Sequence, residues 1–330
     1  MLSKRVCGLL GALLLLTSAA CGTMPASSPP EPTPPPPSAT SVPQTPATMP
    51  TDATATSIPP SATPEPPAAA RVNGETIYLG DFYRELEQYK SFLESQGTDL
   101  NSQEGQERME QARDRILTMM IERVLTRQAA EKAGVVVGED QVEQYMRDMI
   151  AESGGEEAFR AKLGKWGETI EQAKREVRAQ LIGMQMTQRA VAQVPESDEQ
   201  VHARHILVDT REEALRIRSQ LEAGADFASL AKAHSQDEST RDSGGDLGYF
   251  PRGILISPEV EEVAFSLQPG QFSEVISSTM GFHIVQVVER DPDRAIGAHT
   301  LQLLREQAIS EWIESLWAQA HVERVVDSAP

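Results

Sequence analysis

Cysteine is almost absent from this chain of 330 residues, which contains only Cys7 and Cys21. Both lie at the N-terminal end, so we expect no internal disulfide in the rest of the chain. Whatever folds there must be stabilised by packing rather than by covalent cross-links.

Basic residues are scarce relative to acidic ones. The chain has 30 Lys and Arg against 49 Asp and Glu, which gives a formal net charge of −19 and a pI near 4.8. No Lys/Arg-rich stripe interrupts this balance. A surface of this kind is repelled by phosphate backbones and anionic lipid, so we expect no nucleic-acid partner and interpret most of the acids as solvated surface.

The sequence has no hydrophobic run long enough to span a bilayer as a permanent helix. The apolar stretch 9–16 is too short for that role. It follows Lys4 and Arg5 and precedes the small residues 18–20. This order is typical of a cleaved export signal, so we predict a signal peptide at residues 1–20.

The residues before Cys21 also resemble the lipobox of bacterial lipoproteins, in which the cysteine is lipidated and becomes the new N-terminus. Ser18 departs from the leucine that a lipobox usually carries. The resemblance implies lipidation of Cys21 and an anchor on the outer face of the bacterial cytoplasmic membrane. Ordinary signal cleavage, which would give a secreted or periplasmic protein, is the alternative.

Residues 21–70 are dominated by Pro, Thr, Ser and Ala, and sixteen of the 22 prolines fall there. Such a segment cannot bury enough apolar surface to offset its ordering entropy. We therefore predict an extended, disordered tether. A ligand for a proline-binding module is the alternative interpretation.

Residues 71–196 have the patterns of a helical domain. Asn73-Gly74 predicts a tight hairpin, because this dipeptide favours the turn that joins two short strands. Gly80 or Asp81 is then expected to cap the first helix. Further helices are expected at 107–133, 138–152, 168–191 and, near the C-terminus, 299–320, which precedes a strand in "HVERVVD".

Several methionines in these helices are interpreted mainly as core residues, since the thioether fills irregular gaps. Met184 and Met186 are two positions apart and therefore lie on different faces of their helix. We expect one of the two to be exposed, where it could contact a bound polypeptide.

Residues 197–292 have a different character from their flanks. A strand at 203–208 is followed by helices at 212–223 and 227–234, a glycine-rich loop, a helix at 258–265 and strands at 272–275 and 281–288. This order predicts a compact α+β unit. The polar stretches "PESDEQ" and "RDPDRA" are interpreted as the joints that insert it into the helical material.

Five motifs in this unit, found in order, resemble the parvulin family of peptidyl-prolyl isomerases. They are "ARHILV", "ADFASLAKAHSQD", "SGGDLGYF", "EEVAFSLQPGQFSEVISS" and "GFHIVQVVER". The flanks, with "VNGETI" and a closing "VERVV", resemble the helical chaperone domain of PrsA- and SurA-type foldases. The resemblance implies an α+β fold, with an antiparallel-rich parvulin-like sheet at 197–292 inserted between the chaperone-domain parts 71–196 and 293–330.

By motif match, the resemblance implies that His205, Asp237 and His283 are the catalytic residues. It assigns Ser278, at a position that usually holds threonine or serine, to the substrate-binding residues. The proline pocket maps to Leu247, Phe250, Leu255 or Ile256, and Val260. Two departures affect the shape of this pocket: Ser257 is interpreted as an insertion, and Val260 stands where a phenylalanine is common. His202 is interpreted as a surface residue.

Isomerisation of an Xaa-Pro bond breaks amide resonance over a barrier of roughly 18 to 20 kcal/mol but cuts no bond. An apolar pocket and polar groups matched to the twisted amide are therefore sufficient. We expect no cofactor and no metal, since the sequence has no Cys pair and no His-Glu-x-x-His pattern. The acidic "DTREEA" argues against phosphorylated substrates.

Two functions remain open at this point. One is an exported peptidyl-prolyl cis-trans isomerase and foldase that acts on unfolded or nascent exported polypeptides. The other is a catalytically weak holdase that uses the parvulin fold as a peptide-binding module. The sequence also leaves open whether the helical domain forms a homodimer.

Overall fold

The computed structural model describes residues 66–165 and 167–326. The expected signal peptide, Cys21 and nearly all of the tether lie outside the described residues. Below, "helical segments" means residues 66–196 and 296–326, and "sheet segment" means residues 197–295. Across the described part of the chain, no helix is both long enough and apolar enough to cross a membrane.

The helical segments begin with the predicted hairpin, formed by β1 (Ala68–Val72) and β2 (Glu75–Tyr78). Asn73 and Gly74 have φ angles of 52° and 86°, the left-handed conformation that a tight hairpin turn requires. The C-terminal strand β7 (Val322–Arg324) pairs with β1, which gives the sheet order β2-β1-β7. The two distant ends of the described chain therefore share one small sheet.

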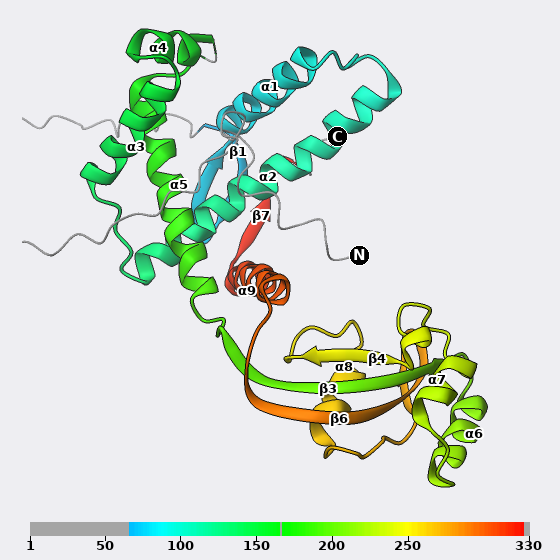
Figure 1. Cartoon of the computed structure of the whole chain (residues 1–330). Helices are drawn as coiled ribbons and strands as arrows, with labels where there is room; N and C mark the ends of the chain where they lie inside the picture. The colour runs from blue at the N-terminus through cyan, green and yellow to red at the C-terminus, as the bar shows by residue number, and fades with distance from the viewer. Residues whose placement is uncertain (1–65, 166, 327–330) are drawn as a thin grey trace, which may run out of the picture. The chain divides into compact units, whose positions relative to one another are not determined.

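Helices α1 (Leu79–Ser95) and α2 (Gln103–Lys132) pack on this sheet (Figure 1). The predicted cap of α1 at Gly80 or Asp81 is wrong, because the hairpin leads directly into the helix and Tyr78 is its N-cap. Gly134, with a φ of 66°, follows the end of α2. Its N–H donates to the carbonyl of Glu131, and that of Val135 donates to the carbonyl of Ala130, which is the usual glycine-terminated helix end.

A second core lies between α3 (Glu139–Glu152), α4 (Glu156–Lys165) and α5 (Ile170–Val191). Helix α4 was not predicted. Gly154 and Gly155 both have positive φ and separate it from α3, and Phe159 anchors it in the core. The last helix, α9 (Ala298–Gln319), packs against α5 and α2. Of the two methionines singled out, Met186 is buried and Met184 is 52% exposed.

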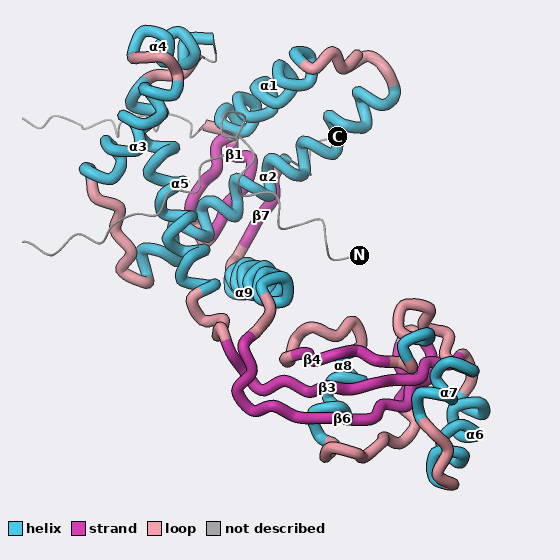
Figure 2. Tube along the Cα trace, in the orientation of Figure 1, coloured by secondary structure: helices cyan, strands magenta, loops and turns pink. Residues whose placement is uncertain are grey.

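The sheet segment contains four strands, β3 (Ser197–Val208), β4 (Asp246–Phe250), β5 (Ile276–Ser278) and β6 (Gly281–Ala295). They form an antiparallel sheet of order β4-β3-β6-β5 (Figure 2). Its helices are α6 (Arg211–Glu222), α7 (Phe227–His234) and α8 (Pro258–Ser266). The predicted fold class is confirmed: an antiparallel α+β unit is inserted between helical segments.

Three details of the sheet differ from prediction. Most of the two polar stretches is strand rather than joint, since residues 197–200 belong to β3 and residues 290–295 to β6. Ser197 pairs with Ala295, and the N–H of Ile296 donates to the carbonyl of Glu196 over 2.8 Å. Ladder hydrogen bonds form between backbones whatever the side chains, so polarity does not prevent pairing. The glycine-rich loop contains β4. The strand expected at 272–275 lies at 276–278, and only Phe272 makes a bridge in the predicted range.

The two faces of the sheet carry separate cores, because successive side chains of a strand alternate between faces. Ala203, Val285 and Val287 pack with α8. Ile206, Val208, Ile284 and other buried residues pack with α6 and α7. The sheet therefore holds the backbone of β3 and β6 firmly from both sides, which matters for the residues they present.

Candidate active site

The register of β3 and β6 brings two histidines together. His205 lies opposite Val285, and His283 lies opposite Leu207, so the histidines are diagonal neighbours on the face that packs with α8. Their rings are nearly parallel, with an interplanar angle of 22° and centroids 5.6 Å apart. Their Nδ1 atoms are 3.4 Å apart. His205 is 7% exposed and His283 is 2% exposed, so little freedom is left to either ring.

Asp237 reaches this pair from the segment that follows α7. The N–H of Gln236 donates to the carbonyl of Leu207 over 2.7 Å. The buried hydroxyl of Ser235 accepts from the N–H groups of Leu207 and Asp237. These bonds attach the segment to the end of β3. They place Oδ2 of Asp237 2.7 Å from Nε2 of His205.

The Asp237 carboxylate has several other hydrogen-bond donors. Oδ1 accepts from the backbone N–H of Ser239 over 3.0 Å and from its hydroxyl over 2.6 Å. Oδ2 accepts from the hydroxyl of Thr240 over 2.6 Å. Burial alone would raise the pKa of Asp237, but the hydrogen bonds from Ser239, Thr240 and His205 outweigh it and hold this pKa well below its usual range. Asp237 is therefore a carboxylate at neutral pH.

His283 is neutral at the same pH. Burial lowers its pKa from 6.5 to about 4, and the neighbouring charge of His205 acts in the same direction. A neutral imidazole has one donor and one acceptor nitrogen. In the contact between His283 and His205, one Nδ1 must therefore donate and the other must accept.

The hydrogen-bond network assigns these roles for two neutral rings. His205 donates from Nε2 to Asp237, which leaves its Nδ1 as an acceptor. Nδ1–H of His283 then donates to Nδ1 of His205, and Nε2 of His283 accepts from the hydroxyl of Ser278, 2.7 Å away. Ser278 in turn accepts from the N–H of Met280 over 3.0 Å. The result is one directed chain of donors that ends on the carboxylate.

Gly245 explains why the glycine-rich stretch lies so close to this network. Its carbonyl accepts from the N–H of His205 over 2.8 Å. A Cβ at this position would lie 2.0 Å from the His205 carbonyl oxygen, and its φ is 79°. Only glycine allows the backbone to press against β3 here. The motif therefore positions the histidine backbone as well as forming β4.

The residues assigned to the proline pocket fall into three groups. Phe250 and Val260 are 3% and 2% exposed and belong to the core beneath α8. Leu247 and Leu255 are partly exposed and pack on that core. Ile256 is 88% exposed and does not join the cluster. Of the two alternatives left open by the sequence, Leu255 is therefore the one that packs with the other apolar residues.

Sequence reasoning missed several members of the site. Ser239 and Thr240 follow Asp237 directly, and hydroxyl residues two and three positions after an aspartate are a recognisable signal for a turn that bonds its carboxylate. Ile254 packs beside Leu255 on the α8 core. Met280 is 49% exposed, and its Sδ lies 3.6 Å from the Ser257 hydroxyl.

The remaining histidines of the sheet segment lie outside the network. His202 was expected at the surface, but β3 begins earlier than predicted and the ring is half-buried. Its Nε2 lies 2.7 Å from Oδ1 of Asp246, and its ring packs on Tyr249 with centroids 5.0 Å apart. His234 contacts Glu213 of α6, with Nδ1 3.7 Å from Oε1. It is thus a packing residue between α7 and α6.

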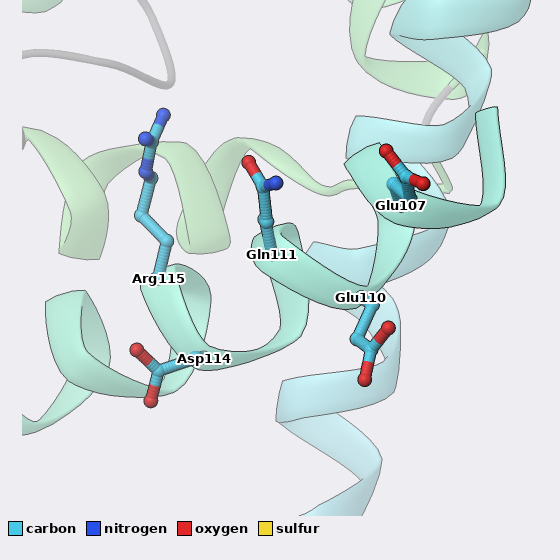
Figure 3. Close-up of a pocket in the computed structure, with 5 residues that line it drawn as sticks. All are labelled: Glu107, Glu110, Gln111, Asp114 and Arg115. Atoms are coloured by element: carbon cyan, nitrogen blue, oxygen red, sulfur yellow. The ribbon is translucent and has the colours of Figure 1, made fainter. Parts of the chain in front are cut away.

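A hollow of about 520 Å³ lies elsewhere, on α2 in the helical segments (Figure 3). Glu107, Glu110, Gln111, Asp114 and Arg115 line it. These polar side chains spread outward from one helix, and the site described above shares no residue with it.

Two family models match the chain. A model described as a PPIC-type PPIase domain matches residues 191–289, and a model described as a SurA-like N-terminal domain matches residues 59–170. The foldase protein PrsA of Caldanaerobacter subterraneus is 31% identical over 236 residues, covering 66% of this chain and 72% of that protein. The chain belongs to the PrsA foldase family.

The chain is also similar to two further proteins. The chaperone SurA of Burkholderia orbicola is 33% identical over 160 residues, 43% of this chain and 35% of that one. The crystal structure of the peptidylprolyl isomerase PrsA from Bacillus anthracis is 26% identical, with a TM-score of 0.40, and covers 62% of this chain and 94% of that one. The two family models and the PrsA relative confirm the predicted resemblance: the chain is a parvulin-type peptidyl-prolyl isomerase.

Proposed function

We propose that the chain accelerates proline-limited folding of exported polypeptides and that His205, His283 and Asp237 carry this activity. The observation that supports the proposal most directly is the donor chain from Ser278 through both imidazoles to the Asp237 carboxylate. Both imidazoles are buried and each is hydrogen-bonded through both of its nitrogens, as required of a polar environment organised before the substrate arrives.

The chemistry needs little more than this arrangement. An Xaa-Pro bond has a trans preference of only about 0.5 to 1 kcal/mol but a barrier of roughly 18 to 20 kcal/mol. The partly exposed Leu247 and Leu255 would hold the proline ring while the preceding carbonyl rotates. The fixed dipoles of the histidine pair would stabilise the twisted amide better than the planar one. Phe250 and Val260 would support this wall from below.

The Asp237 carboxylate also argues against covalent catalysis. A carboxylate that accepts from Ser239, Thr240 and His205 has its lone pairs engaged and is a poor nucleophile. In the proposed mechanism its role is electrostatic. It fixes the tautomer of His205, and His205 in turn fixes that of His283.

The N-terminal sequence features support export of the chain. In this proposal residues 1–20 are removed on export, Cys21 carries lipid, and residues 21–70 form the tether that holds the folded part outside the membrane. Mass spectrometry of the mature N-terminus tests the cleavage and the lipidation. A diacylglyceryl mass on Cys21 supports the anchor, whereas an unmodified N-terminus supports a secreted or periplasmic protein.

In the same proposal, residues 71–196 and 293–330 form one chaperone domain interrupted by the isomerase domain at 197–292. The pairing of β1 with β7 supports this division, since it joins the first and last strands of the described chain. Sedimentation velocity of the purified chain, with its tether removed, would show whether this domain forms a homodimer.

A proline-limited refolding assay tests the isomerase activity. Wild type should increase the rate of the slow phase, and the variant with His205→Ala and His283→Ala should not. His234→Ala is the matched control, because this histidine lies in the same segment but outside the network. Equal slow-phase rates with and without wild-type protein would contradict the proposal.

Binding of unfolded chains by the helical segments is a second function that a specific observation favours. Helix α9 has no fully buried residue, although it contains Trp312, Ile313 and Leu316. Leu303 is 42% exposed, and Met184 of the neighbouring α5 is 52% exposed. Exposed apolar side chains on neighbouring helices are candidates for contact with an unfolded chain. Suppression of aggregation that persists in the double histidine variant would support a holdase activity independent of isomerisation.

A further inference from the structure

The loop that connects β4 to α8 is held by one carboxylate. Oε1 of Glu261 accepts from the N–H of Gly253 over 2.8 Å. Its Oε2 accepts from the N–H groups of Ile254 and Leu255, both over 3.1 Å. Three consecutive backbone donors therefore converge on a single side chain. Such converging N–H groups form an anion-binding concavity.

Both ends of the loop are attached as well. The guanidinium of Arg252 lies 4.1 Å from the centre of the Phe265 ring. The buried Ser257 accepts through its carbonyl from the N–H groups of Val260 and Glu261. Gly253 has a φ of 84°, the left-handed conformation in which successive N–H groups can turn to one side.

Glu261 is itself in a fixed position. It lies in the first turn of α8, and α8 is anchored by the buried side chains of Val260, Ala264 and Phe265. The carboxylate therefore fixes a loop without regular secondary structure at a set position relative to a packed helix. Without the Glu261 carboxylate, these three backbone N–H groups would have to donate to water instead.

The orientation of the loop side chains follows from these bonds. With their N–H groups turned toward Glu261, Ile254 and Leu255 pack on the apolar core beneath α8. The next residue, Ile256, points away and is 88% exposed. The choice between Leu255 and Ile256 as pocket residue is thus set by the backbone that Glu261 holds, and not by the sequence of the loop, in which the two side chains are nearly equivalent.

We propose that Glu261 is a positioning residue for substrate binding, and that it acts by holding Leu255 in the wall that receives the proline ring. This inference rests on the proposed isomerase function. Glu261 touches neither histidine and takes no part in the chemistry of the twisted amide. Its loss should weaken binding of the substrate and leave the histidine network intact.

The test compares Glu261→Gln and Glu261→Ala with Glu262→Gln, an exposed glutamate on the same helix turn. Steady-state kinetics on an unphosphorylated proline peptide should give a KM about fivefold higher for Glu261→Ala, with kcat changed less than about twofold, since ground-state binding is lost while the reacting groups stay in place. Glu261→Gln, which keeps one acceptor oxygen, should fall between this variant and wild type. Glu262→Gln should match wild type.

Amide hydrogen exchange gives a second measurement that does not depend on activity. The amides of residues 253–255 should lose protection in Glu261→Ala, while those of β3 and β6 keep it. An unchanged KM, or equal protection of 253–255 in both proteins, would overturn the inference. Failure of the isomerase proposal would be recognised separately, because His205→Ala would then leave turnover unchanged.

Discussion

Nδ1 of His205 and Nδ1 of His283 lie 3.4 Å apart, although the two residues are far apart in the chain. This distance follows from the strand register, which sets His283 opposite Leu207 and His205 opposite Val285. Diagonal neighbours on one face of an antiparallel pair are close enough for long side chains to meet. The two rings consequently act as one hydrogen-bonded unit.

The first prediction is that the effects of substituting the two histidines on kcat/KM are not additive. His205→Ala and His283→Ala should each lower kcat/KM by about tenfold or more, and the double variant should lose little beyond the worse single variant, because residues that act as one unit fail together. A protease-coupled peptide assay measures all three. A double variant whose loss equals the product of the two single losses would show independent roles.

The second prediction concerns the hydroxyl that bonds His283. Ser278→Ala removes the donor 2.7 Å from Nε2 of this ring and should lower kcat/KM by roughly threefold to tenfold, as expected for one hydrogen bond in a buried network. Ser277→Ala, at the adjacent exposed position, is the control and should be neutral. The ¹⁵N chemical shifts of His283 should change only in the Ser278 variant, and unchanged shifts would argue against the proposed proton order.

The third prediction concerns the support of the carboxylate. Thr240→Val keeps the shape of the side chain but removes its hydrogen bond to Asp237. The activity should fall about twofold to fivefold, since Ser239 and His205 still bond the carboxylate. Thr279→Val, an exposed threonine near Ser278, serves as the control. Full activity of the Thr240 variant would mean that the carboxylate does not need this donor.

The fourth prediction is a pH dependence of stability that comes from His283. Its folded pKa of about 4 lies below the value of 6.5 for a free imidazole, so between these values the unfolded chain binds the additional proton. The stabilising contribution is therefore complete above about pH 6.5 and is lost as the pH falls toward 4, with a slope of at most about 1.4 kcal/mol per pH unit.

Urea unfolding at several pH values should show this slope in wild type and a shallower one in His283→Asn. Three other titratable groups near His283, namely His205, Glu259 and Asp237, remain in the variant, so the difference between the two slopes reports on His283 and its coupling to them. The depressed pKa of Asp237 affects stability at lower pH, as its carboxylate begins to take up a proton. Identical slopes in both proteins would contradict the neutral, buried state of His283.

The fifth prediction tests the contact between the hairpin turn at Asn73 and the chain just before β7. Asn73 donates from its side chain to Gln128 over 2.8 Å, and its side-chain oxygen accepts from the N–H of His321, also over 2.8 Å. Its backbone is left-handed, with a φ of 52°, which asparagine tolerates better than alanine. Asn73→Ala should lower the free energy of unfolding by about 1 to 3 kcal/mol in urea titrations. The control is Asn101→Ala, in the exposed α1–α2 connection. A change equal to that of the control would contradict the proposed role of this contact.

The sequence by itself determined much of the architecture, wherever a signal is local. Asn73-Gly74 specifies a turn, and Gly134 a helix end, because each depends on the φ of one or two residues. The motif around His205 and the one around His283 could be placed on strands by their short runs of apolar and β-branched residues. The order of helices and strands, and the insertion of one unit into another, follow from the same kind of information.

Only the tertiary structure decided which residues meet. The polar stretches at 197–200 and 291–295 pair as strands, and Glu261 holds Leu255 inward by accepting from its N–H. Ser239 and Thr240 donate to the Asp237 carboxylate. Each of these contacts requires a particular geometry of the backbone or the side chains. Strand pairing depends on a partner far away in the chain. Whether a hydrogen bond forms depends on differences of a few tenths of an ångström in the donor–acceptor distance. Composition and periodicity carry neither quantity, so these features required the folded chain.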